Sequence, residues 1–143
     1  MTNPSLAALA LALLASPALA DTPFDAAAEA QRQLERIAAL DDTGPTLNAV
    51  IVHEPEAPNH ANEASKAGMP LEGRTVLVKD NIETSEWPTT AGSLALKDNM
   101  TRRDAPMIAR LRAAGGVVLG KTNLSEWANI RANRSTSGWS AVG

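Results

Sequence analysis

The second half of the chain alternates between strand-forming and helix-forming patterns, and this alternation restricts the possible fold more than any other feature. Residues 75–78 are a nearly continuous apolar run, which is typical of a strand buried on both faces of a sheet. Asp104 can cap a helix that has Pro106 in its first turn and ends at Gly115. Residues 116–120 form a second apolar run. A strand, a helix and another strand in this order predict a parallel α/β unit.

Other segments are expected to form shorter elements around this unit. Apolar side chains at helical spacing predict an amphipathic helix over residues 23–40, and an apolar, partly β-branched run predicts a strand over residues 47–52. We expect a short helix over residues 59–67, a long loop over residues 80–93 and another short helix over residues 124–129. An open parallel sheet needs more strands than these, so we expect the chain to be an incomplete part of an α/β domain.

The first twenty residues have the pattern of a secretory signal peptide. They contain no Asp, Glu, Lys or Arg, residues 6–15 are apolar, and Ala18 and Ala20 form an A-x-A cleavage pattern. The apolar run is short for a membrane span, which needs about 20 residues; a buried core helix and an uncleaved anchor are the alternatives. We therefore expect a signal peptide over residues 1–20 with cleavage after Ala20. Residues 21–143 would then be periplasmic or secreted, without stable membrane association.

Charge, aromatic content and cysteine usage exclude several classes of protein. Thirteen basic and sixteen acidic residues give a net charge of −3, whereas a nucleic-acid-binding protein usually carries a basic stripe. The aromatic side chains, Phe24, Trp87, Trp127 and Trp139, are too few for a surface that stacks bases. The chain has no cysteine, which excludes disulfides, thiolate metal ligands and a cysteine nucleophile. We expect no nucleic-acid partner.

One motif matches a functional pattern and a second nearly does, but neither is supported by its sequence context. Residues 115–122 read GGVVLGKT and match the phosphate-binding loop G-x-x-x-x-G-K-[ST]. That loop follows a strand and has flexible backbone, whereas here a helix is expected before the motif and residues 117–119 are strand formers. Residues 138–143 are one residue too long for a G-x-S-x-G nucleophile elbow. The chain has two histidines, His53 and His60. Two isolated histidines are a poor metal site, and no sequence motif supports a serine–histidine triad that would use either of them.

Lys79 is the residue with the clearest catalytic potential. It directly follows the first apolar strand of the α/β unit, and open α/β sheets bind ligands at the carboxyl ends of their strands. Partial burial there would disfavour the charged ammonium and free the amine to act as a base. The alternative is a solvated lysine, or a lysine paired with Asp80.

Five blocks of sequence resemble the amidase signature family in their order and spacing. They are Val76–Ile82 (VLVKDNI), Thr89–Ser93 (TTAGS), Arg110–Gly115 (RLRAAG), Gly120–Trp127 (GKTNLSEW) and Ser137–Ser140 (SGWS). The resemblance covers residues 45–143, and Trp127 stands where the family more often has phenylalanine. It implies the amino-terminal part of an α/β/α sandwich with a mixed sheet, incomplete in this chain.

The resemblance also implies a chemistry and a role for Lys79. Members of the family hydrolyse linear carboxylic amides through an acyl-serine intermediate, using a Ser–Ser–Lys triad. Lys79 matches the catalytic lysine, which accepts a proton through one serine while the other serine attacks the amide carbonyl. Both serines belong to a glycine- and serine-rich signature that would begin after Gly143, and Ser137 and Ser140 do not match them. The resemblance implies a small-molecule or peptide amide as substrate and no metal or organic cofactor.

Two alternatives to an exported amidase stay open. The tRNA-dependent amidotransferase A subunit shares these motifs, but it works in the cytoplasm, which the predicted signal peptide disfavours. The second alternative is a non-catalytic binding or assembly module, because both triad serines are missing from the 143 residues.

The turn after the second apolar strand carries a structural prediction. Thr122 or Asn123 can cap the helix expected over residues 124–129, and Glu126 lies three residues after Asn123, so its carboxylate can reach back to the cap amide. We expect this capping box to fix the geometry between strand and helix rather than to take part in catalysis.

Overall fold

A computed structural model describes residues 23–128, in which helices surround a three-stranded sheet. The helices are α1 (Ala26–Ile37), α2 (Ala57–Lys66) and α3 (Pro106–Ala113), and the strands are β1 (Val50–His53), β2 (Thr75–Lys79) and β3 (Val117–Thr122). Shorter helical turns lie at Ala38–Asp42, Leu94–Leu96 and Glu126–Ala128. None of the helices described here is long and apolar enough to cross a membrane. The predicted signal peptide and the last resembling block, Ser137–Ser140, lie outside the described residues.

Strand β3 lies at the centre of the sheet, whose strand order is β1-β3-β2. β3 runs parallel to β2, and α3 lies between them in the chain, which confirms the predicted parallel α/β unit. β1 pairs with β3 in the antiparallel direction, so the sheet is mixed, as the resemblance implied. Val76 pairs with Val118 but Leu77 pairs with Gly120, which makes Leu119 an extra residue in β3 and creates a bulge.

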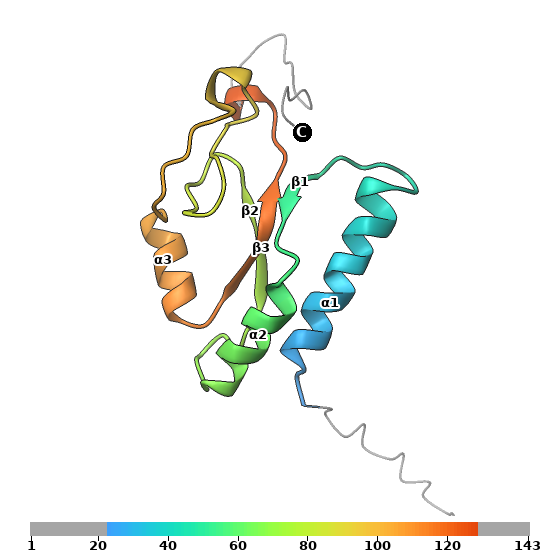
Figure 1. Cartoon of the computed structure of the whole chain (residues 1–143), viewed down its shortest axis with the longest axis vertical. Helices are drawn as coiled ribbons and strands as arrows, with labels where there is room; N and C mark the ends of the chain where they lie inside the picture. Colours follow the sequence, from blue (N-terminus) through green and yellow to red (C-terminus); the bar gives the residue numbers. More distant parts are fainter. Residues whose placement is uncertain (1–22, 129–143) are drawn as a thin grey trace, which may run out of the picture.

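Helices cover both faces of the sheet, which gives the expected α/β/α layering over the described residues (Figure 1). On one face, α1 and α2 pack against β3 through buried apolar side chains. These are Ala26, Ala30, Ile37, Ala57, Ala61, Val117 and Leu119. On the other face, Ile108 of α3 packs against Val78 and Val118. Burying apolar area on both faces is the main force that holds such layers together.

Helix α1 is shorter than predicted because polar side chains terminate it. Asp25 is the N-cap, and its carboxylate accepts a hydrogen bond from a first-turn amide at 3.0 Å, so Pro23 lies before the helix. The helix ends in a π-helical turn that contains the buried Asp41. The carboxylate of Asp41 accepts hydrogen bonds from the amides of Ala49 at 2.7 Å and Val50 at 3.0 Å. These bonds fix the start of β1, which begins later than predicted.

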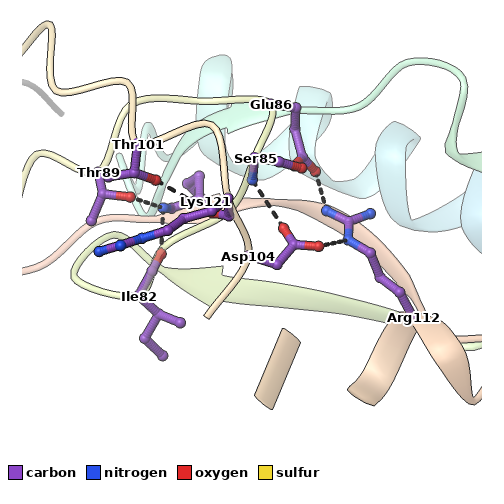
Figure 2. A network of polar contacts seen from close by, with 9 residues as sticks. Ile82, Ser85, Glu86, Thr89, Thr101, Asp104, Arg112 and Lys121 are labelled. Atoms are coloured by element: carbon purple, nitrogen blue, oxygen red, sulfur yellow. Dashed lines mark hydrogen bonds and ion pairs between the residues drawn. The ribbon is translucent and has the colours of Figure 1, made fainter. Parts of the chain in front are cut away.

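The prediction that Asp104 caps α3 is wrong. Ala105 is the N-cap of α3, without a side-chain hydrogen bond. The Asp104 carboxylate instead accepts hydrogen bonds from the Ser85 amide at 2.9 Å and from Arg112 Nε at 3.0 Å (Figure 2). Asp104 therefore joins the long loop after β2 to α3, a long-range role that local spacing does not reveal.

Candidate functional site

The carboxyl ends of β2 and β3 bring together the residues around Lys79. Lys79 is the last residue of β2 and pairs with Thr122 of β3. Alternation along the strand puts its side chain on the face opposite Val78, which packs against α3. Lys79 therefore lies at the strand end where it was predicted, but its side chain is exposed within the described part of the chain. The partial burial considered from the sequence is not found there.

Asp80 and Lys121 form an ion pair inside the protein. Nζ of Lys121 lies 3.1 Å from Oδ1 of Asp80, and the side chains are 1% and 2% exposed, respectively. The ammonium also donates to the carbonyl oxygen of Ile82 at 2.8 Å and to the hydroxyl of Thr89 at 3.4 Å (Figure 2). Charges removed from water are tolerated only with such partners. Asp80 thus pairs with Lys121, and not with Lys79 as one alternative from the sequence proposed.

The second carboxylate oxygen of Asp80 holds the following loop. Oδ2 accepts hydrogen bonds from the amide of Thr90, at 3.2 Å, and from the Thr90 hydroxyl. The Asp80 backbone donates to the Thr122 carbonyl at 3.0 Å and accepts from the Ala91 amide at 2.9 Å. A single residue therefore ties together the ends of β2 and β3 and the TTAGS block at residues 89–93.

The bulge at Leu119 decides on which face of the sheet Lys121 lies. In a regular strand, Lys121 would share the face of Val117 and Leu119, which pack toward α1 and α2. The extra residue shifts the alternation of side chains between the two faces by one position, so Lys121 pairs with Val78 and lies on the same face. Sequence analysis missed the buried pair. The signal that could have found it was the pair of opposite charges, Asp80 and Lys121, just after two apolar runs that were predicted to be adjacent parallel strands.

The GGVVLGKT motif forms a strand rather than a phosphate-binding loop, as the sequence context predicted. Its residues 117–122 are β3, and its lysine is buried in the ion pair. At Gly120, a Cβ atom would lie 2.2 Å from the carbonyl oxygen of Val52, so only a glycine fits where β1 pairs with β3. His53 and His60 lie in β1 and α2, and residues 23–128 hold no cluster of three metal-ligating side chains.

A cavity of about 280 Å³ lies beside the buried pair. Asp80 and Lys121 contribute to its wall, together with the apolar side chains of Trp87 and Leu94. Lys97 also lines the cavity, but its side chain is 62% exposed and forms an ion pair with the neighbouring Asp98. The cavity is therefore lined by two lysines, of which Lys97 is exposed to solvent and Lys121 is buried.

The predicted capping box at Asn123 is wrong. The side chain of Asn123 accepts from the adjacent Leu124 amide at 2.9 Å and donates to the Asn48 carbonyl at 2.9 Å. The region predicted as a helix is only a 3-10 turn, since Trp127 has a φ of 55°. Asn123 therefore connects the residue after β3 to the segment before β1. Its role is structural, as expected, but it joins distant segments instead of capping a helix.

Ion pairs on the surface hold the loop between β2 and α3. Arg103 donates to both carboxylate oxygens of Glu83 at 2.8 Å, and this hydrogen bonding holds the pKa of Glu83 below its usual value. Arg112 of α3 pairs with both Glu86 and Asp104 (Figure 2). The loop that carries the TTAGS block is thus fixed to the helix at one end and to the buried pair at the other.

The described residues form a mixed α/β sheet flanked by helices, and comparison with known proteins identifies the family. The amidase family model matches residues 30–138. The native peptide amidase from Stenotrophomonas maltophilia is 52% identical, with a TM-score of 0.75 over 84% of this chain and 26% of that chain. An amidase family protein from Bacillus anthracis is 35% identical at the same TM-score, over 83% and 25% of the two chains. The chain belongs to the amidase family.

Curated relatives agree with this assignment. A probable amidase from Arabidopsis thaliana is 42% identical over 114 residues, which are 73% of this chain and 22% of the relative. The glutamyl-tRNA(Gln) amidotransferase A subunit of Thiobacillus denitrificans is 40% identical over 99% of this chain and 28% of the relative. The chain therefore spans about a quarter of the length of these relatives.

Proposed function

We propose that this chain is the amino-terminal part of an exported amidase that hydrolyses linear carboxylic amides. The observation that carries the proposal is the position of Lys79. It is the exposed last residue of β2, within the VLVKDNI block, in a chain 52% identical to a peptide amidase. An amine at the carboxyl end of a parallel strand lies where α/β proteins bind their substrates.

In the proposed reaction, Lys79 acts as the base that activates a serine. Two serines supplied by the protein after residue 143 complete the site. The nucleophilic serine loses its proton through the second serine to Nζ of Lys79, and its oxygen bonds to the amide carbon. The C–N bond then breaks, and the departing nitrogen takes up a proton from the same relay. Water hydrolyses the acyl-serine ester and regenerates the serine.

We infer that the substrate is a small-molecule or peptide amide. Support comes from the peptide amidase relatives, one of which was solved with the competitive inhibitor chymostatin. The reaction as proposed uses protein side chains alone.

Export rests on the charge-free, apolar stretch and the A-x-A pattern before Asp21. Mass spectrometry of the protein from its own cell envelope and medium tests this part. A mature amino terminus at Asp21 is expected, and a protein retained in the cytoplasm with Met1 intact would contradict export.

The amidotransferase A subunit is the second candidate function. It is favoured by one observation, the match to the glutamyl-tRNA(Gln) amidotransferase of Thiobacillus denitrificans over 99% of the chain. An intact amino terminus in the cytoplasm would support this candidate. A stop codon directly after codon 143 would instead favour a non-catalytic module, because no serine pair would follow.

The test of the amidase uses the extended protein, which we define as this chain together with the coding sequence that follows codon 143. Release of ammonia from a panel of peptide amides and small aliphatic amides measures the activity. Lys79→Ala is expected to lower kcat by about 10²–10⁴-fold, the usual contribution of general acid–base catalysis. Lys97→Ala removes an exposed lysine and is the matched control. An unchanged kcat in Lys79→Ala would rule out the assigned base.

A further inference from the structure

We propose that Lys121 neutralises the buried carboxylate of Asp80 and thereby keeps the neighbouring Lys79 able to accept a proton. The inference rests on the proposed function, because it concerns the same base. Asp80 and Lys121 act as positioning residues: they set the charge and the backbone around Lys79 without touching the substrate.

The argument begins with the charge next to the base. Asp80 directly follows Lys79, and a carboxylate close to a lysine favours the protonated ammonium, which cannot act as a base. The side chain of Asp80 is 2% exposed, so water and salt screen its charge poorly. An unpaired Asp80 would therefore oppose the function proposed for Lys79.

Lys121 supplies the compensating charge from the adjacent strand. Its ammonium lies 3.1 Å from Asp80 Oδ1, and it is anchored by the Ile82 carbonyl at 2.8 Å. Because side chains alternate along a strand, this pair lies on the face of the sheet that packs against α3, and Lys79 lies on the opposite face. Lys121 therefore acts on Lys79 through its electric field and through the strand backbone, not through contact.

Other charged groups near this end of the sheet are already compensated or lie on the surface. Glu83 pairs with Arg103, and Lys97 pairs with Asp98. The remaining charged groups on the elements around the pair are Glu86 and Asp104 with their shared partner Arg112, the exposed Arg102 and Arg110, His53 at the end of β1, and Glu126 in the turn after β3. The pair is thus the only couple of opposite charges among residues 23–128 in which both side chains are nearly fully buried.

The experiment measures kcat/KM against pH in the extended protein. Its rising limb reports the loss of a proton from the base of the free enzyme. Lys121→Met, which leaves Asp80 unpaired, is expected to move the midpoint of this limb up by about one pH unit, the low end of the effect of a nearby charge. Asp80→Asn leaves an unpaired ammonium and is expected to move the midpoint down. The double variant Asp80→Asn/Lys121→Met removes both charges and is expected to restore the wild-type midpoint.

Lys97→Met, which removes a solvated positive charge from the same cavity wall, is the matched control and is expected to leave the midpoint unchanged. If both single variants had lower activity but kept the wild-type midpoint of the pH profile, the pair would be purely structural and the proposal would be wrong. If one single variant did not fold, the other and the double variant would still decide, because their midpoints are predicted to differ. Activity that survives Lys79→Ala would instead overturn the proposed function itself.

Discussion

Replacing Lys121 by methionine should destabilise the protein far more than a typical surface substitution. Methionine matches the length of the side chain but removes the ammonium, so Asp80 stays in a site that is 2% exposed without its counter-charge. The Ile82 carbonyl loses its 2.8 Å donor at the same time. Removing one partner of a buried ion pair costs about 3–5 kcal/mol. Because the urea m-value rises with chain length above the about 1–3 kcal/mol/M of small proteins, the unfolding midpoint of the extended protein should fall by about 1 M.

Urea unfolding of the extended protein, followed by tryptophan fluorescence, measures this loss. Trp87 lines the same cavity as the pair and contributes to this signal together with the other tryptophans of the protein. Lys97→Met is the control and should change the stability by less than about 0.5 kcal/mol, as surface substitutions usually do. The double variant Asp80→Asn/Lys121→Met should cost less than the sum of the single variants, because the two charges act as a couple. A Lys121→Met variant as stable as the Lys97→Met control would refute the reasoning.

Three further perturbations test other contacts. Gly120→Ala would put a Cβ 2.2 Å from the Val52 carbonyl and should lower stability by about 1–3 kcal/mol, seen as a lower melting temperature; an unchanged melting temperature would contradict the close strand crossing. Asn123→Ala removes the 2.9 Å bond to the segment before β1 and should cost about 1 kcal/mol while amide hydrolysis stays within a few-fold; a hundredfold loss of rate would place Asn123 in the catalytic machinery. Arg103→Ala should let the pKa of Glu83 rise toward its usual value in an NMR titration. Because the Glu83 pKa is lowered in the folded protein, its contribution to stability is present above the usual pKa and is lost as the pH falls; a titration unaltered by the substitution would argue against the pair.

Local patterns were sufficient to predict the α/β unit. Two apolar runs indicated buried strands, and a helical pattern lay between them. Parallel strands are usually joined by a right-handed connection through a helix, so this order predicts β2, α3 and β3. The position of Lys79 at the end of β2 followed in the same way. The mixed sheet was expected only from the family resemblance, since nothing in the first strand's own residues sets its direction.

Contacts between distant segments could not be read from local spacing. Asp104 has the sequence context of an N-cap, but it bonds to a loop amide and to a guanidinium eight residues later. Asn123 has the spacing of a capping box, yet its nearest carbonyl partner is 75 residues earlier in the chain. The pairing of Asp80 with Lys121 depends on the bulge in β3, and a bulge is set by how two strands meet rather than by one strand's pattern.

The bulge at Leu119 also determines how this strand tolerates a change of length. Inserting one residue between Gly120 and Lys121 would keep the bulge and rotate every later side chain to the other side of the sheet. Lys121 would then lie on the side of Lys79, placing two ammonium groups together and leaving Asp80 buried alone. Substitutions in β3 that preserve side-chain volume should therefore be accepted more readily than a single-residue insertion before Lys121.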